Sequence, residues 1–381
     1  MLESVISFWQ QLLSDPTFGQ LLIFTNCMAY IINLIFVIIY YIIISTAFWD
    51  NIVKRNRCFA IVVGIHAILF RALANPFNYV DTILYDEGFR SISQMTFSEA
   101  VLQVNSYTHW GTGYVLFNWI ISRFTDDSKY LFIIASVFSI FPVIWFYFKT
   151  SKKLLPAVLI FLLYPMMYIM GFGVIRQHMS VAYILLALYY VERPKVSIPL
   201  AILAISLHTS GIVFLPYYLF RRIDFSNNSN WKLVIYVLFV IVICRFSMNY
   251  VLSYMPKYAE IVGSKESENN IIPALWLGGL LLTAIISNLN RQLLFSLEKE
   301  VFVFFIYGTA LAIFCIGLPG MGRFTICFLY VVPIITSFFY TYTNLETRSI
   351  VTIINIIVMV RQLYYEIIGG NFDLNYTLIR E

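Results

Sequence analysis

Long apolar runs recur along this chain, and they constrain its fold more than any other feature. A helix of roughly 20 apolar residues is long enough to cross the hydrocarbon core of a bilayer. The composition agrees, because 60% of the 381 residues are hydrophobic and 12% are charged, against about 25% charged residues in an ordinary soluble domain. Lipid offers the backbone no hydrogen-bond partners, and the runs lack the alternation of barrel strands. The sequence therefore predicts an all-α polytopic membrane protein.

The runs predict about 10–12 transmembrane helices in a single integral membrane domain that covers residues 1–381. The candidate spans are residues 21–48, 58–75, 130–148, 154–170, 173–191, 196–220, 231–254, 273–289, 300–318, 322–342 and 347–364. Lys and Arg are enriched in cytoplasmic loops, and basic clusters lie at residues 54–57, 149–153, 193–195, 221–222, 291–299 and 348. Residues 76–125 then form an extracytoplasmic segment with short amphipathic or re-entrant helices, and residues 255–272 form a second extracytoplasmic loop.

The segment at residues 196–220 is basic at both ends, which is unusual for a single crossing. Two half-helices broken at His208-Thr209-Ser210-Gly211 would return the chain to the side on which it entered. Irregular backbone at membrane depth is tolerated where it is buried in protein or lines a cavity. We therefore favour a re-entrant or broken helix near His208, with a full span as the alternative.

Charge, cysteine spacing and motifs exclude several other classes of function. Most of the net charge of +5 is explained by loop residues that set membrane orientation, so no nucleic-acid partner is indicated. The five cysteines lie in or beside apolar runs without CxxC spacing, which predicts packing residues and no zinc site. No glycine-rich phosphate loop, HExxH motif or removable signal peptide is evident. We expect neither a metal nor a cofactor.

Ionisable residues inside the apolar runs are the strongest functional signal. Arg176 and Gln177 open one run, His208 lies within another, and Arg323 follows Gly320-Met321-Gly322 at the start of a third. A charged side chain at membrane depth costs at least ~2.5–3.5 kcal/mol, so it defaults to a functional interpretation. The planar fork of Arg matches phosphate oxygens, and His can donate to phosphate or accept a proton. These residues predict an anion-binding site, and the alternatives are snorkelling anchors and helix packing.

The first outer segment contains weaker candidates. Carboxylates and aromatic residues occur together there, which suits sugar binding but is also typical of a solvated loop. They include Asp81, Tyr85, Asp86, Glu87, Arg90, Glu99, Tyr107, His109 and Trp110. Arg71 lies near the end of the second apolar run, and its position predicts an interfacial anchor that could also join the site.

Two sequence blocks carry a resemblance to a known family. The run GVIRQHMSVA at Gly173–Ala182, followed by AISLHTSG at Ala204–Gly211, resembles the signature of EpsG-like proteins, a branch of the Wzy-type polymerases of O-antigen and exopolysaccharide. Asp81-x-x-x-Tyr85, Gly113-Tyr114 and Arg323 are similar to the remaining landmarks of that family. The resemblance extends over roughly residues 60–340 and implies a GT-C-like membrane glycosyltransferase.

The resemblance implies an enzyme that joins undecaprenyl-pyrophosphate-linked oligosaccharide units, as donor and acceptor, at the outer face of the bacterial cytoplasmic membrane. It implies catalytic roles for His208, Arg176 and Arg323, and substrate binding by Gln177, Asp81, Tyr85 and Ser210. Membrane lipids, a chain-length regulator and a flippase are the further expected partners. Two alternatives stay open, a flippase or transporter of lipid-linked sugars and an O-antigen ligase.

Overall fold

The computed structural model describes residues 16–75, 79, 81–108, 110–222, 239, 241, 271–316 and 322–368. Helices account for the regular structure of these residues, and no β-strand occurs among them. The prediction of an all-α protein is therefore confirmed. The predicted span at 231–254 and the predicted outer loop at 255–272 lie almost entirely outside the described residues.

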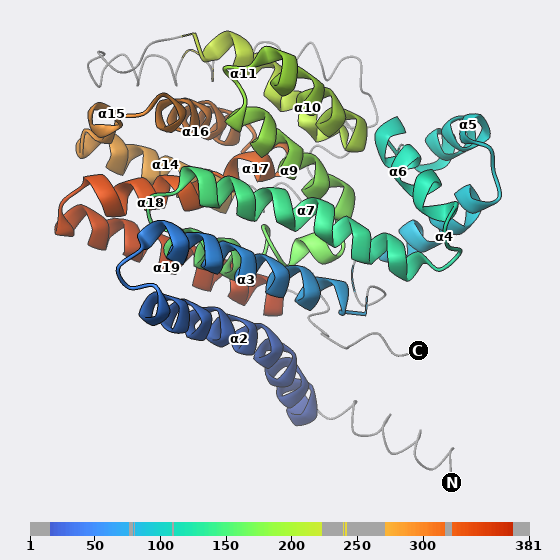
Figure 1. Cartoon of the computed structure of the whole chain (residues 1–381), viewed down its shortest axis with the longest axis horizontal. Helices are drawn as coiled ribbons and strands as arrows, with labels where there is room; N and C mark the ends of the chain where they lie inside the picture. The colour runs from blue at the N-terminus through green and yellow to red at the C-terminus, as the bar shows by residue number, and fades with distance from the viewer. Residues whose placement is uncertain are drawn as a thin grey trace.

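The helices form a bundle with a smaller helical group at one end (Figure 1). The described elements are α2 (Pro16–Ala47), α3 (Ile52–Ala72), α4 (Thr82–Ser93), α5 (Phe97–Thr108), α6 (Thr112–Ser122), α7 (Ser128–Thr150), α8 (Leu154–Leu163), η2 (Met170–Phe172), α9 (Ile175–Tyr189), α10 (Pro194–Leu207), η3 (Thr209–Val213), α11 (Phe214–Phe220), α14 (Ile271–Ile286), α15 (Leu289–Gln292), α16 (Ser296–Phe314), α17 (Gly322–Leu329), α18 (Val332–Tyr342) and α19 (Leu345–Ile368). The smaller group consists of α4, α5 and α6, on the right of the figure.

Three stretches among the described residues are long and apolar enough to cross a membrane, namely Tyr30–Ala47, Ser128–Thr150 and Gly322–Tyr342. The predicted spans at 154–170 and 196–220 are interrupted. The span expected at 154–170 is helical only as far as Leu163, because Pro165 disfavours helical backbone in the residue before it. This predicted span is therefore not a single continuous helix.

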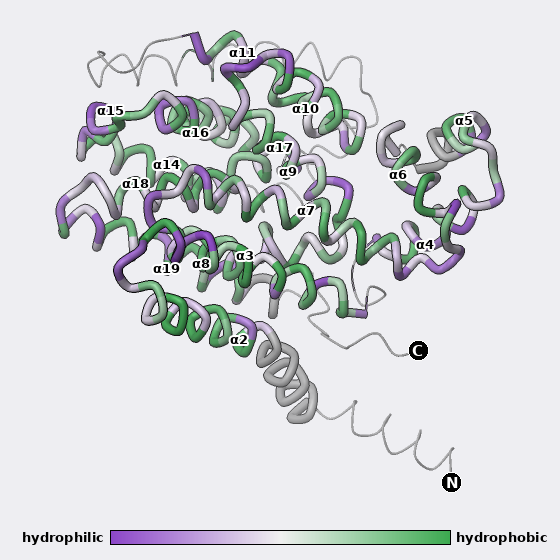
Figure 2. The backbone as a smooth tube through the Cα atoms, in the orientation of Figure 1, coloured by the Kyte–Doolittle hydropathy of each residue, from purple (hydrophilic) through white to green (hydrophobic). Residues whose placement is uncertain are grey.

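Apolar side chains face outward on several of the outer helices. On α2 and α19 they include Ile31, Ile32, Ile35, Phe36, Ile38, Ile39, Ile42, Ile43, Ile350, Ile353, Ile356, Ile357 and Val360. Figure 2 shows mainly hydrophobic helix bodies, with hydrophilic residues gathered at the turns. A soluble monomer rarely exposes a continuous apolar surface of this kind. The chain is a membrane protein.

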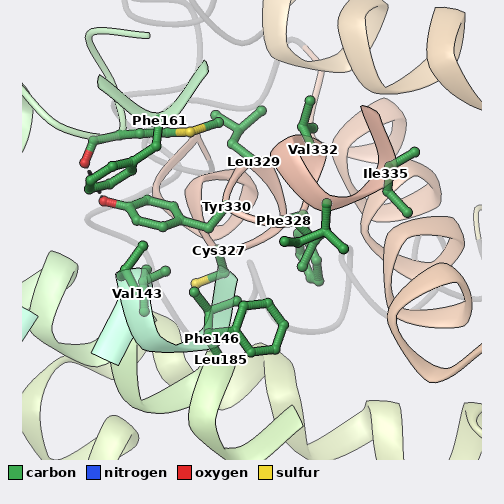
Figure 3. Packing of buried hydrophobic residues seen from close by; sticks show 14 of the residues in the cluster. Val143, Phe146, Phe161, Leu185, Cys327, Phe328, Leu329, Tyr330, Val332 and Ile335 are labelled. Carbon is green, nitrogen blue, oxygen red and sulfur yellow. Dashed lines mark hydrogen bonds between the residues drawn. The ribbon is translucent and has the colours of Figure 1, made fainter. Parts of the chain in front are cut away.

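The core lies where α7 and α9 pack against α17 and α18 (Figure 3). The break between α17 and α18 follows from Pro333, which has no N–H and whose ring would clash with the carbonyl of Leu329 in a continuous helix. The hydroxyl of Tyr147 donates to the freed carbonyl of Tyr330 at 2.9 Å. Cys315 and Cys327 are both buried, in agreement with the packing role predicted for these two cysteines.

Ion pairs connect the turns at the other end of the bundle, away from α4–α6. Lys152 pairs with Glu298 at 2.8 Å, and Arg221 pairs with Glu300 at 2.7 Å. Arg221 also donates to the carbonyl of Val191 at 3.3 Å, so the chain after α11 returns to the point where α10 begins. The segment 196–220 is therefore folded back on itself, with α10 ending at Leu207 and His208 extended.

Candidate functional site

The connection from α8 to α9 places Arg176 in the first turn of a helix. Residues after Tyr164 follow an irregular path through η2, and α9 begins at Ile175. Gly171 leaves room for the guanidinium of Arg71, because a β-carbon there would lie 2.7 Å from its Nη1 atom. The side chain of Arg71 donates a hydrogen bond to the carbonyl of Gly171. The irregular backbone before Arg176 is thus held by a side chain from α3.

Three aromatic rings surround the guanidinium of Arg176. Its central carbon lies 5.6 Å from the ring centroid of Tyr85, 5.6 Å from that of Trp110 and 5.8 Å from that of Tyr114. These distances are within the range of cation–π attraction. The Nε atom of Arg176 is buried without a hydrogen-bond partner. A half-buried cation with an unused donor is suited to an anion.

Gln177 connects the helix of Arg176 to the helix of Arg323. The Gln177 side chain is buried, and its Nε2 atom donates to the backbone carbonyl of Arg323 at 2.5 Å. Arg323 lies in the first turn of α17 and is exposed. One hydrogen bond thus brings two helix starts together, each of which carries an arginine. Helix N-termini add partial positive charge at the same place.

The imidazole of His208 is oriented by Ser210. The backbone N–H of Ser210 donates to Nδ1 of His208 at 3.2 Å, and the Ser210 hydroxyl lies 2.7 Å from the same atom. A backbone N–H can only donate, so Nδ1 is the acceptor and the neutral ring carries its proton on Nε2. Among the described residues Nε2 has no partner. The Nε2 N–H of His208 is therefore available as a hydrogen-bond donor.

The structure brings most of the predicted site residues into one electrostatic neighbourhood. His208 lies within electrostatic range of both Arg176 and Arg323. Tyr85 lies within electrostatic range of the same two arginines and of Asp81. Asp81 is exposed and precedes α4 with a left-handed backbone, at φ 66°. Burial raises the pKa of the Tyr85 hydroxyl, so that it remains a hydrogen-bond donor at neutral pH. Gln177 and Ser210 are buried and contact other site residues.

Arg71 is not an interfacial anchor, because its side chain is only 6% exposed and packs over the ring of Phe172. His178, next to Gln177, is buried as well and contacts the hydroxyl of Tyr330, while its Nε2 atom has no partner. Sequence reasoning named Trp110 only as a weak sugar-binding candidate and Tyr114 only as a family landmark, and it gave His178 no role. The signal for Trp110 and Tyr114 was the aromatic content of an otherwise polar segment.

No group of three or more His, Cys, Asp or Glu side chains in the described part of the chain has the arrangement of a metal site. A sequence model of the EpsG family matches residues 59–378 of this chain. No curated protein and no solved structure matches it. The family match spans α3 to the C-terminal region and includes Arg176, His208 and Arg323. The chain belongs to the EpsG family.

Proposed function

We propose that this protein is a membrane glycosyltransferase that polymerises lipid-linked oligosaccharide repeat units. The EpsG family is associated with glycosyltransferase-like polymerases of polysaccharide biosynthesis. The observation that carries the proposal is the hydrogen bond from Gln177, next to Arg176, to the backbone of Arg323, which joins two arginine-bearing helix starts within electrostatic range of His208. Two guanidinium groups and an N–H donor at one place suit the pyrophosphate of an undecaprenyl-linked sugar.

In the proposed reaction a hydroxyl on the non-reducing end of the acceptor unit attacks the anomeric carbon of the donor chain. The bond between that carbon and the pyrophosphate oxygen breaks, and undecaprenyl pyrophosphate leaves with the electron pair. Arg176 and Arg323 stabilise the negative charge that develops on the leaving group. Holding two lipid-linked substrates in register supplies much of the remaining acceleration.

His208 is assigned to the leaving group, because its Nε2 atom carries the proton and faces no protein acceptor among the described residues. Ser210 holds the imidazole, and Gln177 holds the two arginine-bearing helices together. The proton of the attacking hydroxyl needs a separate acceptor. Asp81 is the candidate, because it is exposed and lies within electrostatic reach of Tyr85.

The proposed site faces the outside of the cytoplasmic membrane. The basic turns, which include Lys152 and Arg221, lie at the end of the bundle opposite α4–α6, and basic turns are typical of the cytoplasmic side. The α10–α11 hairpin then enters and leaves on the cytoplasmic side. At 14 residues, α10 is about 21 Å long, shorter than the roughly 30 Å hydrocarbon core.

Cysteine labelling tests this orientation. With the native cysteines replaced, Lys195→Cys and Arg222→Cys should both resist a membrane-impermeant maleimide added to intact cells, because both ends of the hairpin lie inside. Gln94→Cys, at the exposed turn between α4 and α5, should be labelled readily. Labelling of Arg222→Cys but not of Lys195→Cys would replace the hairpin by a full span.

Deleting the gene and examining surface polysaccharide on a gel tests the function itself. A polymerase deletion should leave chains of a single repeat unit. Loss of all chains would indicate the flippase alternative, and free polymer that is not attached to lipid A core would indicate the ligase. Expression of the Arg176→Ala variant in the deleted strain should reproduce the single-repeat phenotype, which would connect the result to the site.

A further inference from the structure

The rings of Tyr85, Trp110 and Tyr114 contact one another as well as Arg176. Ring centroids are 5.7 Å apart for Tyr85 and Trp110, 5.8 Å for Tyr85 and Tyr114, and 5.1 Å for Trp110 and Tyr114. All three side chains are buried. They come from α4, from the turn before α6 and from α6, whereas Arg176 comes from α9. We call these three residues the aromatic cage.

Glycines fix the aromatic cage in its place. A β-carbon at Gly88, on α4, would clash with the ring of Trp110. β-Carbons at Gly111 and Gly113 would clash with the backbone and side chain of Ser206, two residues before His208. The helical group α4–α6 therefore packs against the end of α10. The aromatic cage thus lies beside the helix break at His208.

Unsatisfied polar atoms collect at the aromatic cage. The hydroxyls of Tyr85 and Tyr114 and the Nε atom of Arg176 are all buried without a hydrogen-bond partner. A buried polar group that lacks a partner destabilises the fold, and such groups are few in native proteins. Three of them on residues whose side chains contact one another indicate an arrangement adapted to a ligand and not to the stability of the ligand-free chain.

We propose that Tyr85, Trp110 and Tyr114 are positioning residues that fix the orientation of the Arg176 guanidinium toward the pyrophosphate of the substrate. The rings exclude water from the faces of the guanidinium, which strengthens its interaction with an anion. They also restrict its rotation, so that its forked donors are preset for phosphate oxygens. The inference rests on the proposed function for the identity of the anion.

Gly88→Ala tests the aromatic cage without removing any group that touches substrate. The added β-carbon must displace the ring of Trp110 from Arg176, and misplacement of a catalytic group by about 1 Å can lower a rate on the order of 10²-fold. We expect polymer formation to fall by at least ~10-fold, and binding of farnesyl pyrophosphate to weaken in parallel. Gly278→Ala is the matched control, because a β-carbon there meets nothing within 4 Å.

Trp110→Phe and Trp110→Leu separate ring positioning from simple packing. Both variants leave an apolar side chain, but only Phe keeps a π face for the guanidinium. Phe should retain most of the pyrophosphate affinity and the rate, whereas Leu should lose both with a similar thermal unfolding temperature. The proposed role of the aromatic cage would be wrong if Trp110→Leu and Trp110→Phe were equally active. It would also be wrong if Gly88→Ala bound farnesyl pyrophosphate as tightly as wild type does.

The two measurements also distinguish the cage from the proposed function. If wild-type protein forms polymer and every cage variant does so equally well, the function stands and the cage is wrong. If wild-type protein forms no polymer but binds farnesyl pyrophosphate in a manner that depends on Gly88 and Trp110, the cage stands and the polymerase function is wrong. Absence of any pyrophosphate binding by wild-type protein would overturn both.

Discussion

Replacing His208 by alanine is expected to lower the rate of polymer formation by roughly 10²–10³-fold, the loss typical of removing one donor that stabilises a developing anion. The effect should fall on the rate and not on assembly. Interhelical hydrogen bonds in membrane proteins average only about 0.6 kcal/mol. The hydroxyl of Ser180 on α9 also donates to the carbonyl of Ala204 at 2.8 Å, and this bond near the end of α10 does not need the His208 side chain.

His208→Gln distinguishes donation from proton transfer. The side-chain amide of Gln can place an N–H near the position of the imidazole Nε2, so this variant should recover at least ~10-fold over alanine if His208 only donates. The measurement is polymer formed from lipid-linked repeat units by purified protein between pH 5.5 and 8.5. Equal inactivity of both variants, with an ionisation seen in the wild-type rate alone, would make His208 a proton carrier.

His66→Gln is the matched histidine control. The ring of His66 contacts Asn33 at 2.6 Å and Tyr40 at 3.2 Å, and these contacts join α2 to α3 away from the site. This variant should have a lower thermal unfolding temperature and an unchanged rate. The opposite pattern is expected of the His208 variants, so the pair separates a structural histidine from a catalytic one.

Arg176→Lys should lower polymer formation by about 10²-fold while protein abundance stays near that of wild type. Lys keeps the charge but loses the planar fork, and its compact ammonium does not fill the aromatic cage as the guanidinium does. The measurement is the length and amount of polymer on a gel, together with the binding of farnesyl pyrophosphate by the purified protein.

Arg222→Lys is the matched control for the arginine substitution. Arg222 is exposed and follows α11, far along the chain from the site residues of α9. It should polymerise as wild type does. Full activity of Arg176→Lys would show that charge alone suffices at this position and would favour a snorkelling anchor over a phosphate clamp.

The class of the protein and the positions of its unusual residues could be read from the sequence. Hydrophobicity and charge are local properties, so the apolar runs indicate helices in a membrane, and Arg176, His208 and Arg323 are conspicuous within them. The break at His208 also follows from local features, because basic residues flank both ends of its segment. None of these inferences needs knowledge of which helices are neighbours.

Only the tertiary structure decided which side chains meet. The bond from Gln177 to the carbonyl of Arg323 joins residues 146 positions apart, and no local pattern encodes that contact. Arg71 has the position of an anchor in its own helix, yet packing against Gly171 buries it. The aromatic cage likewise depends on how α4–α6 are seated on α10. Membrane insertion depends on the average hydrophobicity of a segment. A functional site depends instead on a few contacts between distant segments, and those contacts exist only after the helices have packed.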